Sequence, residues 1–310
     1  MKYKIYKFQF TTGVHLGKDS LEDGEYTLCA DTIFSALCQE CLKQGKDVFG
    51  KLLARTREGK LRFSDAFPFI GDTYYLPKPM LRIANQQQGD SKRKKAYKKL
   101  SYIPMDKLEE YLSGNLDVRQ EQDKFQDKLG RKETKVSAAV RGLEETMPYR
   151  VGIYHFCKQS GLYLILGYEA EEDAMLVETC LESLSYSGIG GKRASGLGRY
   201  ELRFGQLPAD LQQRLEATGN AMSMALSVCL PQDGELEAAL EQAHYLLVKR
   251  SGFVASETYA KEQLRKRDLY VMQAGSCFRT RFEGDVYDVS DGGSHPVYRY
   301  AKPLLMEVIS

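Results

Sequence analysis

The first ten residues alternate between apolar and polar side chains in a way that is typical of a β-strand. Tyr3, Ile5, Phe8 and Phe10 recur at roughly every second position, and aromatic side chains favour extended backbone. Segment 11–17 carries two glycines and breaks this pattern. The opening pattern therefore predicts a strand followed by a glycine-punctuated loop.

Two later stretches have the spacing of amphipathic helices. The first is capped by Asp31 or Thr32 and ended by Gly45. Its apolar stripe consists of Ile33, Phe34, Leu37, Cys38, Cys41 and Leu42. The second begins with acidic residues at 171–173, where the helix dipole favours negative charge. Both helices are predicted to face a core.

Strand patterns lie on either side of the second helix. Segments 149–157 and 162–168 are strand-like and are separated by four turn-forming residues, which predicts a hairpin, and a further strand spans 200–204. The order strand, helix, two-stranded hairpin, helix, strand is that of a ferredoxin-like or RRM-like βαββαβ unit. We therefore predict one such domain over residues 1–207.

A second, degenerate round of the same pattern follows Pro208. Strands are predicted at 221–230, 245–255 and 269–278, a helix at 235–243, and an extended segment at 297–308. The second helix of the unit is replaced by irregular chain around 285–294. The predicted fold class is thus α+β, with two ferredoxin-like domains, 1–207 and 208–310.

The pattern is interrupted between about 78 and 148, which we interpret as a long insertion in the first domain. Residues 92–99 hold six positive charges, and 105–135 is rich in mixed charge and poor in large apolar side chains, so we expect partial flexibility. Either the basic run is a solvated segment, or Lys92, Arg93, Lys94 and Lys95 contact nucleic acid, with Tyr97 and Tyr102 stacking on bases.

Composition limits the possible functions. The 310 residues suit two domains, and 44 Lys and Arg against 42 Asp and Glu leave a net charge of +2, which excludes a uniformly basic surface but not segregated charge. No apolar run is long enough to span a bilayer, and the N-terminal segment lacks the pattern of a signal peptide. We expect a cytoplasmic protein without membrane contact. Its seven scattered cysteines are expected to be reduced, and Cys38 and Cys41 to lie in the core rather than on a metal.

Residues 187–199 form the most informative segment, with five glycines, one lysine and two arginines. It is neither a Walker A loop, because Arg193 follows the lysine, nor a dinucleotide fingerprint, because it follows a helix and precedes a strand. Glycine backbone allows a close approach, while Lys192, Arg193 and Arg199 can pair with phosphate oxygens and Ser195 can donate a hydroxyl. A flexible connector with incidental charge is the alternative.

This segment resembles a family signature. Its pattern Gly-x-Gly-Gly-Lys-Arg-x-Ser-Gly-x-Gly-Arg is similar to the glycine-rich loop of the RAMP proteins of CRISPR systems. Shorter matches to the same superfamily, and to its Cas5-like group, are Val14-His15-Leu16-Gly17, Val140-Arg141, Leu76-Pro-Lys-Pro79, Leu100-Ser-Tyr-Ile-Pro104 and Pro296-Val-Tyr-Arg-Tyr300. Over its full length the chain most resembles the family of subunit 4 of the type III-A Csm effector complex.

The resemblance implies a non-catalytic RNA-binding subunit without a cofactor or metal. Its implied partners are the 5′ repeat-derived tag of the crRNA, the large polymerase-like Cas subunit and a Csm backbone subunit, and the insertion corresponds to a thumb-like hairpin used against the guide RNA. The candidate RNA-binding residues are His15, Arg141, Gly190, Gly191, Lys192, Arg193, Ser195, Gly196, Arg199, Lys92, Arg93, Lys94 and Lys95.

An enzymatic alternative rests on His15. Relatives that process crRNA use a histidine in a comparable loop, and a metal-independent ribonuclease needs a general base, a general acid and a cation near the phosphate. His15 and Lys192 could supply part of this set. In the non-catalytic interpretation His15 bonds the RNA backbone or fixes its own loop. The acidic residues Asp285, Asp288 and Asp291 do not have the spacing of a metal-binding loop.

Overall fold

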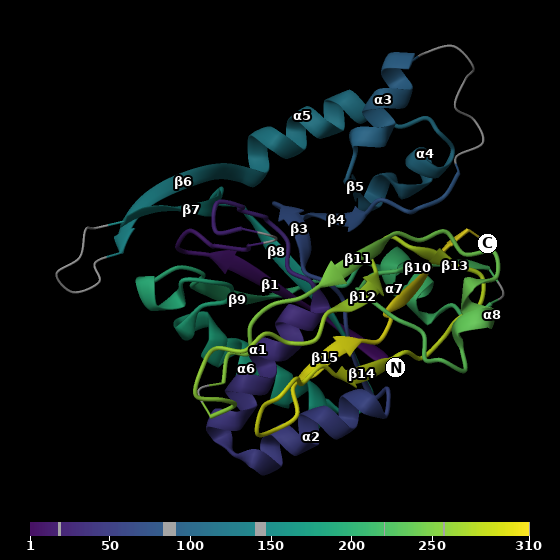
Figure 1. Ribbon diagram of the computed structural model, residues 1–310. Coiled ribbons are helices and arrows are strands. Elements are labelled where there is room, and N and C mark those ends of the chain that lie inside the picture. Colours follow the sequence, from purple (N-terminus) through teal and green to yellow (C-terminus); the bar gives the residue numbers. More distant parts are fainter. Residues whose placement is uncertain (18–19, 83–90, 140–146, 220, 257, 310) are drawn as a thin grey trace.

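The computed structural model describes residues 1–17, 20–82, 91–139, 147–219, 221–256 and 258–309. It is a mixed α/β protein built on antiparallel sheets (Figure 1). The helices are α1 Ala30–Gln44, α2 Lys46–Arg57, α3 Ser91–Lys99, α4 Leu108–Leu112, α5 Val118–Leu129, α6 Glu171–Ser187, α7 Ala209–Glu216 and α8 Leu236–Leu240, with 3-10 turns η1 Met105–Lys107 and η2 Arg193–Ser195. None of the helices in this part of the chain is long and apolar enough to cross a membrane.

The strands belong to one large sheet and several small ones. The seven-stranded sheet has the order β5-β4-β3-β8-β1-β9, and β2 also pairs with β8. Its strands are β1 Lys2–Phe10, β2 Leu61–Phe63, β3 Phe67–Ile70, β4 Thr73–Pro77, β5 Tyr102–Pro104, β8 Ser160–Tyr168 and β9 Tyr200–Gly205. The smaller sheets comprise β6 Gly130–Ala139 with β7 Met147–Phe156, β10 Met222–Ala225 with β13 Cys277–Phe278 and β16 Leu305–Ile309, β11 Leu247–Arg250 with β12 Leu269–Met272, and β14 Asp285–Asp288 with β15 Tyr298–Ala301.

Strand β8 organises the core because both of its faces are covered. All nine of its residues are buried, as the nearly continuous apolar run Leu162–Leu166 requires. Alternate side chains point to opposite faces of a strand, so Leu164 and Tyr163 enter different hydrophobic clusters. The central sheet is therefore packed on both sides.

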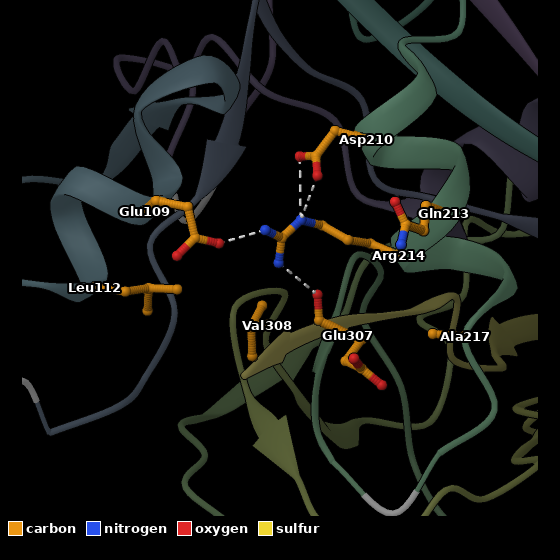
Figure 2. Close-up of a pocket in the computed structure, with 8 residues that line it drawn as sticks. All are labelled: Glu109, Leu112, Asp210, Gln213, Arg214, Ala217, Glu307 and Val308. Atoms are coloured by element: carbon orange, nitrogen blue, oxygen red, sulfur yellow. Dashed lines mark hydrogen bonds and ion pairs between the residues drawn. The ribbon is translucent and has the colours of Figure 1, made fainter. Parts of the chain in front are cut away.

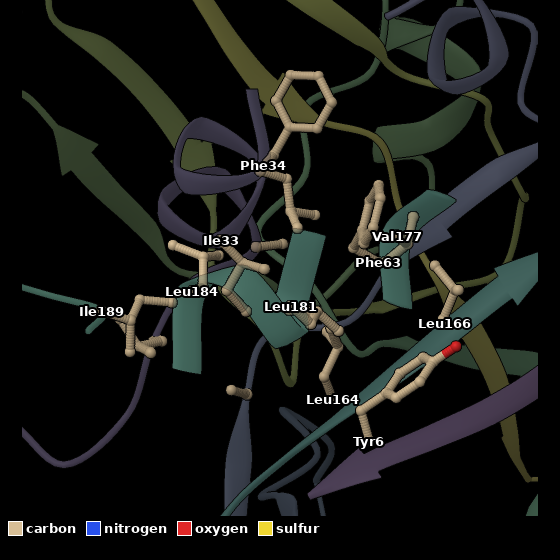
Figure 3. Close-up of a cluster of buried hydrophobic side chains, with 14 of the residues drawn as sticks. Tyr6, Ile33, Phe34, Phe63, Leu164, Leu166, Val177, Leu181, Leu184 and Ile189 are labelled. Carbon is tan, nitrogen blue, oxygen red and sulfur yellow. The ribbon is translucent and has the colours of Figure 1, made fainter. Parts of the chain in front are cut away.

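On one face of the sheet, α1 and α6 supply the apolar side chains that cover it. Figure 3 shows Ile33 and Phe34 from α1 and Leu181 from α6 gathered beside Leu164 and the other sheet residues, and all of these side chains are buried. The helical spacing predicted from the sequence is confirmed, although Leu42 on α1 is 50% exposed and lies outside the buried stripe. Cys41 is buried with its sulfur 3.3 Å from that of Cys180, so this cysteine belongs to the core as predicted.

The opposite face of the sheet is covered by the C-terminal part of the chain. Leu211 of α7, Met224 of β10 and Met306 of β16 pack in one cluster with Ile5 and Tyr163 of the central sheet. The connection between β9 and α7 contains the predicted boundary at 207/208. The division of the chain into two ferredoxin-like domains stays a prediction, and the C-terminal elements share their core with the N-terminal ones.

The predicted hairpin between the two strands before α6 is wrong. Strand β7 pairs along its whole length with β6, whereas β8 pairs with β1, β2 and β3. The turn at 157–160 closes with a hydrogen bond from the Ser160 N–H to the Cys157 carbonyl, but the strands then separate into different sheets. A turn-length connection between two apolar segments was therefore not sufficient to predict their pairing.

The described part of the insertion has a small core of its own. Tyr97, Leu100, Ile103, Tyr111, Leu116 and Val118 are buried together. Tyr97 donates its hydroxyl to the Leu116 carbonyl at 3.0 Å, and the Tyr102 ring stacks on Phe125 with ring centres 5.9 Å apart. The expectation that these two tyrosines stack on nucleic-acid bases is therefore wrong, because their rings pack inside the protein.

The predicted N-cap of α1 is also wrong. The helix begins at Ala30, and its N-cap residue is Cys29, without a side-chain cap. The Ala30 N–H instead donates to the Asp65 carboxylate at 2.7 Å, which also accepts the Val228 N–H at 3.0 Å. Asp65 therefore caps α1 from outside the helix, and Asp31 is free to pair with arginines of the C-terminal part.

The buried cap makes stability depend on pH. Burial raises the pKa of Asp65 to about 7, although the Ala30 and Val228 N–H groups oppose this shift. The folded state then holds a proton between about pH 4 and 7 that the unfolded state lacks, so the stability from this group is lost as pH rises through that window. Asp65→Asn keeps an acceptor oxygen and cannot ionise. We expect its melting temperature, relative to the wild type, to increase between pH 5 and pH 8.

Asp72→Asn is the matched control, because Asp72 is exposed in the turn between β3 and β4. The difference in melting temperature between Asp72→Asn and the wild type should stay constant over the same pH range. Parallel curves for Asp65→Asn and the wild type would contradict the assignment of this pH dependence to Asp65.

Candidate RNA-binding site

Backbone hydrogen bonds join three segments that are far apart in the sequence. The turn at 13–17 lies between β7 and the glycine loop at 188–199. On one side, Val14 and Tyr154 exchange N–H···O bonds of 2.8 and 2.9 Å. On the other, the Gly191 N–H donates to the His15 carbonyl at 2.9 Å, and the Gly198 N–H donates to the Gly13 carbonyl at 2.9 Å. We call this arrangement of turn, glycine loop and β7 the loop junction.

Two glycines of the loop are required by close backbone contacts. A Cβ on Gly190 would lie 2.6 Å from the His15 carbonyl oxygen, and one on Gly198 would lie 2.0 Å from the Ile189 carbonyl oxygen. Both residues also have positive φ angles, of 94° and 80°. Gly196 has a φ of 81° but open space at its Cβ position. Gly190 therefore lets the loop pack closely against the turn, and Gly198 lets the two ends of the loop approach each other.

Lys192 is held in an unusual conformation at the loop junction. Its backbone is left-handed, with φ 57° and ψ 29°, which is uncommon for a residue other than glycine. Its ammonium lies 4.7 Å from the centre of the Tyr149 ring on β7 and 3.5 Å from the Tyr149 hydroxyl oxygen. The side chain thus reaches from the glycine loop to β7.

The other polar loop residues are placed differently. Arg193 donates to the Gln39 side chain on α1 at 3.2 Å and is half-buried. Ser195 is exposed in η2, and its N–H donates to the Lys192 carbonyl at 2.9 Å. The Arg199 side chain is exposed, while its backbone N–H donates to the Thr12 hydroxyl at 3.1 Å. Besides Lys192, the loop therefore carries an exposed arginine, a half-buried arginine and an exposed hydroxyl.

His15 is a buried part of the loop junction. Its side chain is 6% exposed, and Nδ1 lies 2.7 Å from the Gly152 carbonyl oxygen on β7. The ring also fills the space beside Gly191, where an added Cβ would lie 2.6 Å from Cδ2. Of the roles considered for His15, this geometry favours fixing its own loop.

The β6–β7 ribbon adds exposed cations that sequence reasoning did not select. Arg131, Lys132 and Lys135 on β6 and Arg150 on β7 are exposed, and Glu133 is the acidic residue among them on β6. The ribbon extends away from the body of the protein at the upper left of Figure 1. Tyr149 was also missed, because its proximity to Lys192 depends on the fold and leaves no local sequence signal.

The structure does not bring all of the predicted RNA-binding residues together. The basic run forms α3, at the upper right of Figure 1, whereas α6 and β9, which flank the glycine loop, lie on the left. Lys95 is exposed on α3. The side chains of Lys92, Arg93 and Lys94, and all of Arg141, lie outside the described residues. The glycine loop and the basic helix are therefore separate surfaces.

A cavity of about 450 Å³ lies away from the loop junction, between α4, α7 and β16 (Figure 2). Arg214 of α7 points into it, donates to Asp210 at 3.1 Å and to the Glu307 carbonyl at 3.3 Å, and contacts Glu109 of the insertion. The contact between Arg214 and Glu109 joins the insertion to the C-terminal part of the chain. Because the carboxylates of Asp210 and Glu109 already neutralise Arg214, the cavity is not an open anion site. Among the described residues, no group of three or more His, Cys, Asp or Glu side chains is arranged to hold a metal ion.

Comparisons with known protein families divide the chain into two matched regions. Residues 7–201 match the model of the RAMP superfamily, and residues 218–308 match the model of the CRISPR Csm4 C-terminal domain. A relative from Mycobacterium tuberculosis, described as CRISPR system Cms protein Csm4, is 40% identical over 308 residues, covering 99% of this chain and 98% of the relative. A protein of the same description from Streptococcus thermophilus is 36% identical, covering 99% of each chain.

Solved structures with a similar fold include chains of two complexes that contain Csm4. A chain in the crystal structure of the Csm3–Csm4 subcomplex of the type III-A CRISPR-Cas interference complex is similar with a TM-score of 0.69 and 19% identity, over 99% of each chain. A chain of the Csm1–Csm4 cassette in complex with cA4 has a TM-score of 0.63 and 18% identity, covering 100% of this chain and 98% of that one. At these identities the likeness concerns the fold.

Proposed function

Because the chain belongs to the Csm4 family of the RAMP superfamily, we propose that it is a non-catalytic subunit of a type III-A Csm complex that binds the 5′ repeat-derived tag of the crRNA. The observation that carries the proposal is the loop junction, where Lys192 reaches β7 of the cationic β6–β7 ribbon and Arg193 lies on the same loop, bonded to Gln39 of α1. Cations on a glycine-rich loop suit the phosphates of a single strand, and exposed bases of such a strand can stack on aromatic side chains.

We further propose that the subunit contacts the large polymerase-like Cas subunit and a Csm backbone subunit, and that it acts in the cytoplasm. The supporting observation is that solved relatives of the same fold were crystallised with Csm1 and with Csm3. Co-purification of a tagged chain expressed from its native operon tests this proposal. We expect both protein subunits and crRNA in the eluate, and their absence would contradict it.

Removing the two loop cations is expected to weaken RNA binding. Lys192→Ala with Arg193→Ala should raise the dissociation constant of a synthetic 5′-tag RNA at least about tenfold, because each charge-assisted hydrogen bond to phosphate contributes on the order of 1.5–3 kcal/mol. The log–log salt dependence should also become shallower, by about 0.7 for each lost single-strand phosphate contact. Fluorescence anisotropy of the full chain at several salt concentrations measures both quantities.

The control removes the same charge elsewhere. Lys46→Ala with Lys51→Ala changes two exposed lysines of α2, which lies at the bottom of Figure 1, far from the ribbon. This variant should keep the wild-type salt slope. If the loop variant also keeps the wild-type slope and affinity, or if the wild-type chain does not bind the RNA, the role proposed for the loop is wrong.

The same preparation separates binding from cleavage. Repeat RNA incubated with the wild-type chain in EDTA is expected to remain intact, because the His15 ring is buried against β7 and Gly191. Metal-independent cleavage that disappears in a folded His15→Ala variant would instead identify a crRNA-processing ribonuclease and overturn the non-catalytic proposal.

A further inference from the structure

Lys192 occupies a backbone conformation in which glycine would be less strained. Left-handed backbone costs a lysine on the order of 1 kcal/mol or more, and such strain persists where the surrounding structure requires it. The loop around it is rich in glycine, with Gly190 and Gly191 immediately before it. A lysine at this position therefore points to a role for its side chain.

Tyr149 is the residue that receives this side chain. It lies on β7 opposite Ser137 of β6, and it is partly exposed. The Lys192 ammonium lies 4.7 Å from its ring centre, within the range of a cation–π contact, and 3.5 Å from its hydroxyl. The contact spans the loop junction, so it links the glycine loop directly to the ribbon.

We propose that Tyr149 is a positioning residue that holds the Lys192 ammonium in place for a phosphate of the bound RNA. This inference rests on the proposed RNA-binding function of the loop. A free lysine side chain samples many rotamers, and a partner that restricts them lowers the ordering cost when RNA binds. Tyr149 thereby increases affinity through Lys192 and does not need to touch the RNA.

A double-mutant cycle tests whether the two residues act together. Tyr149→Leu keeps an apolar side chain but removes the ring, and we expect it to weaken tag-RNA binding about two- to fivefold, as a partly exposed cation–π contact would. Tyr149→Phe keeps the ring and should bind within about twofold of the wild type. In a Lys192→Ala background, Tyr149→Leu should have no further effect.

The outcomes separate this inference from the function on which it rests. If Lys192→Ala weakens binding but Tyr149→Leu does not, the positioning role is wrong and the loop function stands. If Tyr149→Leu weakens binding equally in both backgrounds, Tyr149 acts on the RNA directly or on the fold, and the positioning role is again overturned. If Lys192→Ala itself has no effect, the proposed function of the loop fails.

A measurement without RNA tests the contact itself. Reductive ¹³C-dimethylation of lysines gives one NMR signal for each side chain, and the signal lost in Lys192→Ala identifies Lys192. Its methyl groups should show a ring-current shift in the wild type and in Tyr149→Phe that disappears in Tyr149→Leu. The same signal position in all three proteins would refute the contact.

Lys192→Gly provides a complementary result. Glycine relieves the left-handed strain but removes the cation, so this variant should melt at or above the wild-type temperature while binding the tag RNA as weakly as Lys192→Ala. A lower melting temperature would contradict the view that the lysine is retained for its side chain at a cost in stability.

Discussion

Replacing Asp31 by asparagine is expected to lower the free energy of unfolding by about 3 to 5 kcal/mol, the usual cost of breaking a buried ion pair. Asp31 is 6% exposed on α1 and accepts hydrogen bonds from Arg250 at 2.8 and 2.9 Å and from Arg299 at 3.3 Å. Asparagine leaves the Arg299 guanidinium buried without its countercharge. Because Arg250 and Arg299 belong to β11 and β15, the change also loosens the C-terminal part from α1.

The stability that Asp31 contributes depends on pH with the opposite sign to that from Asp65. Burial alone would raise the pKa of Asp31, but Arg250 and Arg299 outweigh it and hold the pKa below its ordinary value. The stability from this group is present above the unfolded pKa of about 4 and is lost as pH falls below it. The difference in the free energy of unfolding between the wild type and Asp31→Asn should therefore be largest at neutral pH and should shrink only in acid.

Urea unfolding followed by circular dichroism measures this effect. Asp47→Asn is the matched control, since it removes an exposed carboxylate from the first turn of the neighbouring helix α2. It should cost less than about 1 kcal/mol. An Asp31→Asn variant as stable as Asp47→Asn would refute the importance assigned to the buried pair.

Gly198→Ala is expected to destabilise the protein by about 3 kcal/mol and to reduce tag-RNA affinity as well. The new methyl group would lie 2.0 Å from the Ile189 carbonyl oxygen, and the residue keeps a φ of 80°. Both the overlap and the left-handed backbone oppose the side chain, each costing on the order of 1–3 kcal/mol. Relief of the overlap would move residue 198 away from Ile189, at the other end of the same loop, and disturb the Gly198–Gly13 hydrogen bond that joins the loop to the turn.

Gly292→Ala separates the two causes. Gly292 also has a positive φ, of 70°, but nothing lies near its Cβ position, and it belongs to the loop after β14. The free energy of unfolding of Gly292→Ala should fall only by the cost of the left-handed backbone, about 1 kcal/mol, and the variant should keep the wild-type RNA affinity. Equal losses of stability in the two variants would mean that the close contact at Gly198 does not constrain the loop.

Patterns in the sequence predicted an element correctly where the whole pattern lay within that one helix, strand or loop. The alternation of Tyr3, Ile5 and Phe8 predicted β1, and the helical stripes predicted α1 and α6. The glycine signature at 188–199 indicated the family that the comparisons confirm. These features depend on backbone preferences and side-chain spacing within a single segment.

Features that depend on distant segments could not be predicted. The pairing of β7 with β6 rather than β8 depends on which strands cover the central sheet, and β2 and β3 take that place. The insertion looked too polar to order itself, yet Tyr97 and Ile103 contribute to a compact cluster. Asp31 had the position of a helix cap, but it pairs instead with the half-buried Arg250 and the buried Arg299, which lie more than 200 residues away in the sequence.

In the candidate site, the sequence predicted the loop and its cations but not their setting. Nothing near Lys192 in the sequence indicates that Tyr149, on another strand, receives its ammonium. The basic run around Lys95 was predicted with the loop, because both are positively charged, yet the fold places them apart. Whether Lys95 and its neighbours bind RNA stays a prediction.

The two-sided burial of β8 has a consequence during synthesis of the chain. Its second face is closed by Met306 and Val308 of β16, which emerge from the ribosome roughly 140 residues after β8. At about 5–20 residues per second, part of an apolar sheet face stays uncovered for roughly 7 to 28 seconds in every nascent chain. During that interval the nascent protein is a substrate for chaperones, and ribosome stalling before β16 would yield a fragment prone to aggregation.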